Sequence, residues 1–304
     1  MKRLRDSSGG GPSWQQAQIR PDGAESQNPL APGLYVTATP IGNARDITLR
    51  ALDALAACDA IAAEDTRVTA KLLAIHGIAK PLFAYNDHNA AGARPKLLKR
   101  LREGQRIVLV SDAGTPLVSD PGYRLAIEAV AQGSAVFPIP GASAVMAALT
   151  VAGLPTDRFL FAGFTPPKSA GRRSLFAELA PIRASLVFFE GGSRLAASLA
   201  DMAAVFGPRE AMVGRELTKL YETCIRGTLD VLALNPALAT PKGEMVVVVG
   251  PGAEIAATPA DADAALADAL TRLGPAEAAS EVAGALGLNR RELYRRALEL
   301  KGVR

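Results

Sequence analysis

The chain has 304 residues, of which 49% are hydrophobic and 21% are charged, and its formal net charge is +4. This composition excludes a largely disordered protein and supplies enough apolar residues for more than one packed α/β domain. Cys58 and Cys224 stand far apart and only two histidines accompany them, which excludes a Cys/His zinc site and gives no reason to expect a disulfide. Cys58 lies in an alanine-rich helical pattern and is expected to be a small buried thiol.

The N-terminal segment, residues 1–32, is rich in Ser, Gly, Gln and Pro. It has no apolar run behind its first basic residues, so we expect a disordered leader and no signal peptide. No uninterrupted apolar stretch elsewhere is long enough to span a membrane. Together with the cysteine usage, these features predict a cytoplasmic protein.

Strand-like runs alternate with helical patterns through the first half of the chain. The predicted strands are Leu34–Thr39, Ala60–Ala63, Leu82–Tyr85, Arg106–Ser111 and Ala135–Ile139. The predicted helices are one capped by Asp46, one after Glu64-Asp65-Thr66-Arg67 that stops at Gly77, one over Arg94–Glu103, and one that starts at Asp120-Pro121 and ends at Gly133. This alternation predicts α/β units around a mostly parallel sheet.

A second α/β region follows a predicted helix over Ser143–Val151. Its expected strands are Phe159–Phe164, Ser185–Phe189, Ala211–Val213 and Glu244–Val249. Residues 253–263 look like a linker and residues 264–304 are expected to be helical. The sequence therefore predicts two α/β domains, over residues 33–142 and 143–252, and a small helical extension over residues 253–304.

Three turns after predicted strands are rich in Gly, Pro and small polar residues: 39–43, 111–116 and 140–143. Ligands of parallel α/β sheets bind outside the carboxyl ends of the strands, and glycine lets a ligand approach the backbone closely. Asp112 could accept hydrogen bonds, Thr115 and Ser143 offer hydroxyl groups, and Ser143 could also cap its helix. Each turn alone could be an ordinary βα connection, but three together favour a small-molecule site. The dinucleotide, P-loop and hydrolase glycine motifs are absent.

Several strings resemble the ribosomal RNA small subunit methyltransferase I family, a branch of the tetrapyrrole methylase superfamily. They follow one another over residues 33–250 and read ATPIGNARDITLRAL, AAEDTR, NDHN, LVSDAGTPLVSDPGYRL, GLPTDRF, PPKSAGRR, RELTK and KGEM. The resemblance implies two α/β domains with S-adenosylmethionine in the cleft between them and a homodimer. It also implies 2′-O-methylation of a cytidine in the decoding region of 16S ribosomal RNA. Two positions depart from the family pattern, Ala142 where a proline is usual and Ser193 where a histidine is usual.

Donor-binding and catalytic candidates follow from these turns and from the resemblance. The residues expected to bind the methyl donor are Pro40, Gly42, Asp112, Ala113, Gly114, Thr115, Pro140, Gly141 and Ser143. Glu64 is the candidate base for the weakly acidic ribose hydroxyl, and Asp65, Asp87, His88 and Glu190 are further candidates. Glu64 or Asp65 could instead cap a helix, Glu190 could pair with Arg194, and alignment of donor and acceptor could suffice without a base.

Basic residues are the candidates for contacts with RNA phosphates. Lys168, Arg172 and Arg173 are expected to form a basic loop, although a solvated surface would show the same pattern. The other candidates are Arg67, His88, Arg215 and Lys219. A tetrapyrrole remains an alternative substrate, but these basic segments favour RNA.

The C-terminal segment allows two interpretations. Ala283, Gly287 and Leu293 have the spacing of a helix-turn-helix motif, and Asn289-x-x-Glu292 resembles a capping box before an arginine-rich helix. Alone, this pattern could belong to a DNA-binding regulator. We favour a small helical extension that packs on the body of the protein or contacts the ribosome.

Overall fold

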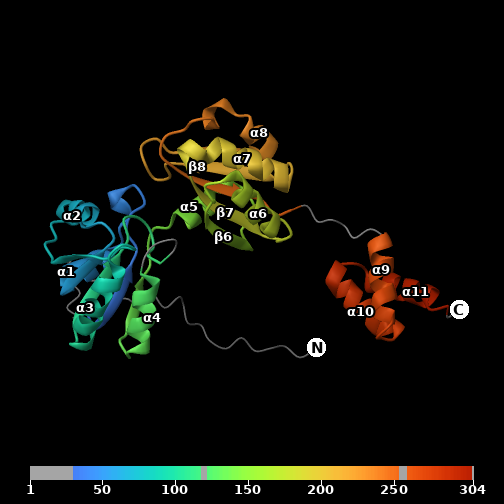
Figure 1. Ribbon diagram of the computed structural model, residues 1–304, viewed down its shortest axis with the longest axis horizontal. Coiled ribbons are helices and arrows are strands. Elements are labelled where there is room, and N and C mark those ends of the chain that lie inside the picture. The colour runs from blue at the N-terminus through green and yellow to red at the C-terminus, as the bar shows by residue number, and fades with distance from the viewer. Residues whose placement is uncertain (1–29, 118–121, 253–258, 303–304) are drawn as a thin grey trace, which may run out of the picture. The chain divides into compact units, whose positions relative to one another are not determined.

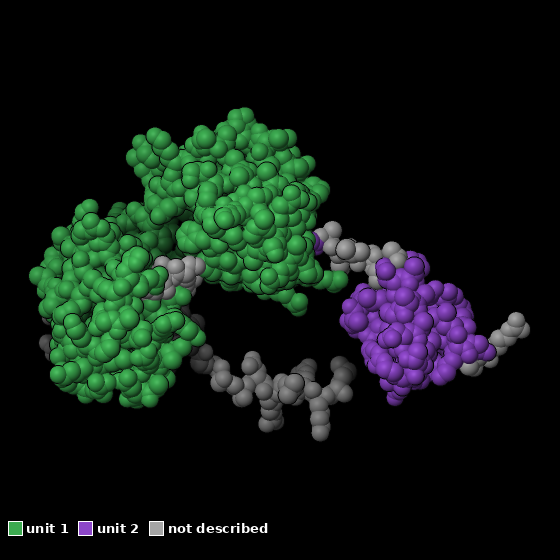
Figure 2. All heavy atoms as spheres, in the orientation of Figure 1, with its two compact units in different colours: residues 1–250 green, residues 251–304 purple. Residues whose placement is uncertain are grey.

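The computed structural model describes residues 30–117, 122–252 and 259–302. The chain divides into two compact units, residues 1–250 and residues 251–304 (Figure 2). Nearly all of the predicted leader, residues 1–29, lies outside the described residues. None of the helices in the described ranges combines the length and the apolar character needed to cross a membrane.

The first sheet is entirely parallel and has the strand order β3-β2-β4-β1-β5. Its strands are β1 (Gly33–Thr37), β2 (Ala60–Ala63), β3 (Leu82–Ala84), β4 (Arg106–Val110) and β5 (Val136–Ile139). The central strands β2 and β4 are buried almost throughout because one helix layer covers each face of the sheet. The expectation of an α/β fold with a parallel sheet is confirmed for this half.

The helices of this half occupy both faces of the sheet (Figure 1). They are α1 (Leu49–Ala57), α2 (Thr66–Ile75), α3 (Ala90–Arg102) and α4 (Tyr123–Ala131). Helices α1 and α2 pack on the face that carries Tyr35 and Val108, while α3 and α4 pack on the face that carries Leu34 and Leu109. Cys58 ends α1, is 1% exposed, and burial raises the pKa of its thiol to about 11, so the predicted buried thiol is confirmed.

Two predicted helix starts differ from the structure. Asp46 ends a short 3-10 helix, η2 (Ala44–Asp46), and α1 is instead capped by Thr48, whose hydroxyl accepts a hydrogen bond from the Ala51 N–H at 3.2 Å. A capping side chain accepts from an N–H group two or three residues further along the chain. Thr48 lies three residues before Ala51, whereas Asp46 lies five residues before it and is too far away. Asp120 and Pro121 lie outside the described residues, and α4 begins after Gly122.

The second sheet has the order β6-β7-β10-β8-β9 and only its β6–β7 pair is parallel. Its strands are β6 (Phe159–Phe164), β7 (Ser185–Gly191), β8 (Glu210–Arg215), β9 (Thr223–Thr228) and β10 (Glu244–Val249). The antiparallel pair of β8 and β9 needs no crossover helix, because a short loop joins these two strands. Strand β9 was not predicted, since its sequence TCIRGT has neither a buried run nor a clear alternation.

Helices again cover both faces of the second sheet. They are α5 (Ala144–Ala152), α6 (Ser169–Leu179), α7 (Gly192–Phe206), α8 (Leu229–Ala233) and the 3-10 helix η3 (Pro236–Leu238). Helices α6, α7 and α8 pack with one core cluster, and α5 packs with the other. The side chain of Ser143 accepts a hydrogen bond from the Met146 N–H, so its predicted capping role is confirmed.

The C-terminal unit consists of α9 (Pro259–Leu270), α10 (Pro275–Leu286) and α11 (Arg290–Leu300), which share a small core of their own. Helix α9 begins inside the segment expected to be a linker, of which residues 253–258 lie outside the described ranges. Gly287 ends α10 in the left-handed conformation. Asn289 caps α11, as the sequence predicts. The predicted boundary between residues 142 and 143 stays a prediction.

Candidate functional site

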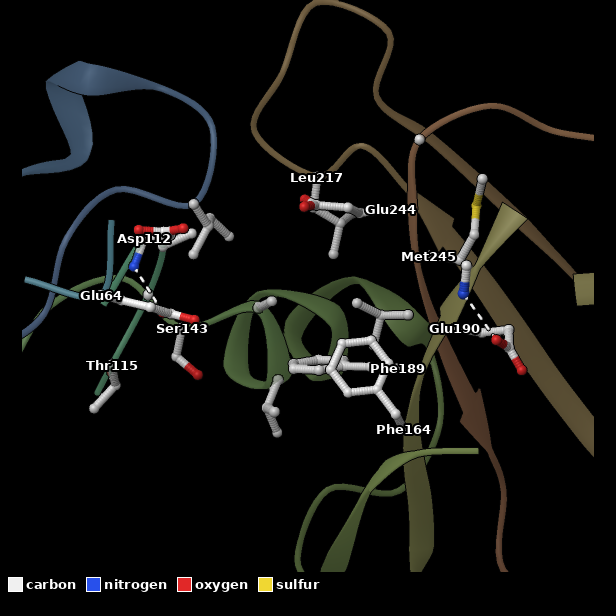
Figure 3. A pocket seen from close by; sticks show the side chains of 18 residues that line it. Glu64, Asp112, Thr115, Ser143, Phe164, Phe189, Glu190, Leu217, Glu244 and Met245 are labelled. Carbon is white, nitrogen blue, oxygen red and sulfur yellow. Dashed lines mark hydrogen bonds between the residues drawn. The ribbon is translucent and has the colours of Figure 1, made fainter. Parts of the chain in front are cut away.

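A cavity of about 330 Å³ opens where turns at the carboxyl ends of β2, β4 and β5 face α5 and the strands of the second sheet (Figure 3). Its volume is in the range of small-molecule sites. The lining residues are Ile41, Glu64, Asp112, Ala113, Gly114, Thr115, Ser143, Ala144, Val145, Phe164, Phe189, Glu190, Gly191, Leu217, Gly243, Glu244, Met245 and Val246. The cavity therefore has a wall of turns from one half of residues 30–250 and a wall of strands from the other.

The turn after β4 forms the centre of the first wall. Gly114 has a φ of +76°, a conformation that side chains other than glycine adopt rarely. Its N–H and C=O groups exchange hydrogen bonds of 3.0 and 2.8 Å with Thr39, which ties this turn to the turn after β1. Thr115 donates a hydrogen bond of 3.2 Å to the Ala142 carbonyl in the turn after β5. Three turns far apart in sequence are thereby held together as one surface.

Glu64 and Asp112 connect the turns after β2 and β4. The Asp112 N–H donates to Glu64 Oε2 at 3.2 Å, and the Asp65 N–H donates to Asp112 Oδ1 at 2.9 Å. Burial is the main cause that raises the pKa of both carboxyl groups above their ordinary values, and nearby carboxylates add to the effect at each. Each of these carboxylates accepts one hydrogen bond from a backbone N–H group and has further lone pairs. Both can therefore accept hydrogen bonds from a ligand in the cavity.

The opposite wall, from the second half, is largely apolar. Phe164 and Phe189 meet edge to face with ring centroids 5.4 Å apart (Figure 3), and Met245 also lines the cavity. Leu217 and Gly243 complete this wall, and Gly243 has a φ of +100°. This positive φ disfavours any residue with a side chain at position 243, and a Cβ atom there would also displace the Glu216 carboxylate, which lies 2.4 Å away.

Glu190 also faces the cavity, but other side chains already satisfy it. Its carboxylate is fully buried and accepts hydrogen bonds from Thr165, Ser198 and the Gly191 N–H. Arg194 pairs with it at 2.8 Å, which is the structural ion pair considered from the sequence. These contacts argue against Glu190 as a base, because a base needs an oxygen free for the acceptor.

Five of the nine predicted donor-binding residues line the cavity. They are Asp112, Ala113, Gly114, Thr115 and Ser143. Pro40 and Gly42 instead line a second, smaller cavity that shares Asp112 with the first. Pro140 and Gly141 line neither cavity, and a Cβ atom at Gly141 would lie 3.1 Å from Ala38 Cβ, so tight packing explains this glycine.

Gly42 has a structural reason of its own. A Cβ atom there would lie 2.3 Å from Lys219 Cγ, so the β8–β9 loop can approach this turn only because the residue is glycine. In that loop, Glu216 and Thr218 have φ values of +50° and +67°, which are rare for residues with side chains. Hydrogen bonds hold this strained loop in place, among them those from the Glu216 N–H to the Glu244 carbonyl at 3.0 Å and from the Thr218 N–H to Glu222 Oε2 at 2.5 Å.

The predicted basic loop around residue 172 is wrong, because residues 169–179 form helix α6. Lys168 and Arg173 are exposed at the start of this helix. Arg172 is 5% exposed, pairs with Asp201 at 2.8 Å, and donates to the Pro167 carbonyl at 3.0 Å. A guanidinium enclosed in this way fastens α6 to α7 and is not presented to an RNA phosphate.

The remaining RNA candidates also differ in availability. Arg67 is 86% exposed, although it pairs at 2.6 Å with Asp65, which caps α2 as one alternative interpretation expected. His88 lies on the surface after β3. Lys219 is bound between Glu216 at 3.0 Å and Glu244 at 2.8 Å, so its charge is neutralised within the protein. That ion pairing argues against a phosphate contact by Lys219.

Sequence reasoning missed the apolar wall. Its main members are Phe164, Phe189, Leu217, Gly243 and Met245. These residues lie on strands and loops far apart in the chain, and an apolar strand residue has the same pattern in a core as on a cavity wall. Only the glycine before β10, in the string KGEM, gave a local signal.

Comparison with known proteins identifies related sequences and folds. The sequence profile described as Tetrapyrrole (Corrin/Porphyrin) Methylases matches residues 33–233, and that of the RsmI C-terminal HTH domain matches residues 256–301. The chain is similar to "Ribosomal RNA small subunit methyltransferase I" of Mesorhizobium japonicum, with 54% identity over 90% of this chain and 94% of the relative. The protein of the same name from Erythrobacter litoralis is 52% identical over 91% of this chain and 98% of the relative.

A solved structure shares the fold. It is the uroporphyrin-III C-methyltransferase from Thermus thermophilus complexed with S-adenosyl homocysteine, with a TM-score of 0.51 and 17% identity. The match covers 72% of this chain and 97% of that one.

The profile of the RsmI C-terminal HTH domain agrees with the helix-turn-helix spacing noted in α10 and α11.

Proposed function

The chain belongs to the tetrapyrrole methylase family, in its ribosomal RNA small subunit methyltransferase I branch, and on that premise we propose that it methylates ribosomal RNA with S-adenosylmethionine. The acceptor is the ribose 2′-hydroxyl of a cytidine in the decoding region of 16S ribosomal RNA. The observation that carries the proposal is the cavity at the turns around Asp112 and Gly114. The chain that forms it is 54% identical to the ribosomal RNA small subunit methyltransferase I of Mesorhizobium japonicum.

The residues of the cavity fit the methyl donor. S-adenosylmethionine supplies an electrophilic methyl group on a positively charged sulfonium, which leaves as a neutral thioether. Asp112 offers carboxylate oxygens to the hydroxyl and ammonium groups of such a molecule, and Gly114 lets it approach the backbone. Phe164 and Phe189 offer aromatic faces, which attract cations.

Glu64 is the proposed proton acceptor. It lies on the cavity wall beside Asp112, and burial raises the pKa of its carboxyl group, which makes its carboxylate a stronger base than an ordinary glutamate. The acceptor oxygen forms a bond to the methyl carbon, the carbon–sulfur bond breaks with its electron pair staying on sulfur, and the hydroxyl proton passes to Glu64. Alignment of the two reactants and exclusion of water supply the rest of the rate enhancement.

The proposed partner is 16S ribosomal RNA within the small ribosomal subunit, and the proposed working form is a cytoplasmic homodimer. Exposed basic groups suit contacts with the RNA backbone. We retain the exposed residues Lys168, Arg173, Arg67 and His88 for this role, together with Arg215, which is half-buried and donates from Nε to the Lys242 carbonyl. Arg172 and Lys219 are omitted because each is already paired with a carboxylate inside the protein.

Transfer of labelled methyl groups tests this function directly. The purified protein is incubated with tritiated S-adenosylmethionine and, in parallel, small ribosomal subunits, naked 16S RNA or uroporphyrinogen. We expect label in RNA, on a ribose whose 3′-phosphodiester bond has become resistant to alkali because the 2′-oxygen is methylated. Label in the tetrapyrrole alone would contradict the proposed substrate, and the failure of calorimetry to detect donor binding would contradict the enzyme class.

A further inference from the structure

A second cavity of about 180 Å³ adjoins the donor cavity, and both include Asp112 in their walls. One side is the turn after β1 and the other side is helix α2. The lining residues are Thr39, Pro40, Gly42, Ala44, Val68, Thr69, Leu72, Ile75, Ser111 and Asp112. The donor cavity does not account for this second space, because the two sets of lining residues share only Asp112.

The helix wall of this cavity is apolar and open to solvent. Val68, Leu72 and Ile75 follow one another at spacings of four and three, so they form one stripe along α2. Val68 is 40% exposed and Ile75 is 65% exposed. A stripe of this kind suits the face of a flat ring, and Thr39, Thr69, Ser111 and Asp112 supply polar groups to the same cavity.

Exposed cations adjoin the lining residues in sequence. Arg67 and Lys71 lie on α2, each one residue before a member of the apolar stripe, and both are exposed. Arg45 is exposed in η2, next to Ala44 on the opposite side of the cavity. A flat apolar wall with exposed cations next to its lining residues matches the chemistry of a nucleotide, in which a ring is flanked by phosphates.

We propose that this second cavity, the acceptor cavity, receives the target nucleoside after it has rotated out of the RNA. The base lies against Val68 and Leu72, and the ribose lies at Asp112, where the two cavities meet. Enzymes that act on a nucleotide within a folded nucleic acid commonly extrude it into such a pocket. The small volume favours a single-ring pyrimidine over a purine. This inference rests on the proposed function and adds where the acceptor binds.

Filling the acceptor cavity tests the inference. Val68→Trp places an indole in the cavity from a partly exposed helix position, so the fold should tolerate it. Ala70→Trp is the matched control, because Ala70 is exposed on the same helix but lines neither cavity. We expect Val68→Trp to lower the rate of methyl transfer to small subunits by about 100-fold. The dissociation constant for S-adenosylmethionine should change by less than about twofold, and the control should behave as the wild type.

The outcomes separate the two proposals. If the wild type transfers no methyl group to ribosomal RNA, the proposed function fails. If the wild type is active and Val68→Trp is equally active, the acceptor cavity is wrong while the function stands. Loss of donor affinity in Val68→Trp, with Ala70→Trp unaffected, would also overturn the inference, because the indole would then be blocking the donor cavity.

The cations provide a second readout. In a chain carrying both Arg45→Gln and Lys71→Gln, we expect KM for small subunits to rise by about tenfold and its dependence on salt to weaken, because two phosphate contacts are lost. The turnover number and the affinity for the donor should not change. Unchanged KM and salt dependence would show that Arg45 and Lys71 do not contact the phosphates of the bound RNA.

Discussion

The candidate charged residues in the two halves of unit 1 have different partners. In the first half, the contacts that hold Glu64 and Asp112 come from backbone N–H groups, and lone pairs remain for a ligand. In the second half, Glu190, Arg172 and Lys219 are each paired with an opposite charge inside the protein. Residue type alone therefore does not reveal which charges bind ligands, because the partners of each charge decide this.

The largest expected effect comes from Glu64→Gln, which tests the first half. We expect the rate of methyl transfer to fall by about 1,000-fold, because the amide cannot accept the hydroxyl proton. The wild-type rate should increase with pH as Glu64 loses its proton, over a range displaced above the ordinary glutamate value because burial raises its pKa. Single-turnover rates measured across pH for both proteins check this.

Glu178→Gln is a suitable control, since this carboxylate is exposed on α6 and lines neither cavity. A Glu64→Gln protein with the wild-type rate and pH profile would show that alignment alone drives transfer.

Arg172 and Arg173 are neighbours in the second half, but one is buried in an ion pair and the other is exposed. Arg172→Ala leaves Asp201 buried without its cation and should lower the free energy of unfolding by about 3 kcal/mol. Arg173→Ala should leave stability unchanged and raise KM for small subunits by about threefold, because it removes an exposed charge near the RNA. Urea unfolding and transfer kinetics on both variants separate the two roles. Equal stability of the two variants would contradict the structural role of Arg172.

The smallest effect concerns Asp59, which joins β2 to β4 away from the cavity. Hydrogen bonds from Arg106 lower the pKa of Asp59 to about 2. A lowered carboxyl pKa stabilises the folded chain above the ordinary aspartate value, and this contribution is lost as pH falls toward 2. Asp59→Asn should therefore be less stable than the wild type at pH 7, and the difference should shrink between pH 4 and pH 2. A difference that stays constant in urea unfolding across this range would contradict the expectation.

Much of the local structure could be predicted from the sequence. Strands β2, β6 and β10 have the predicted bounds, because their apolar runs are short and end at polar or glycine residues. Ser143 and Asn289 cap their helices as expected, since capping depends on residues within a few positions of each other. The turn around Asp112 and Gly114 was also identified, because a polar, glycine-containing turn after a buried strand is itself a local pattern.

Tertiary structure alone decided the rest. The antiparallel order of the second sheet follows from which strands pair, and the burial of Arg172 depends on Asp201, 29 positions away. The meeting of Phe189 with the turn around Asp112 at one cavity likewise joins distant parts of the chain. Sequence patterns report contacts between residues a few positions apart, whereas a charge or an aromatic ring takes its role from neighbours that only the folded chain brings together.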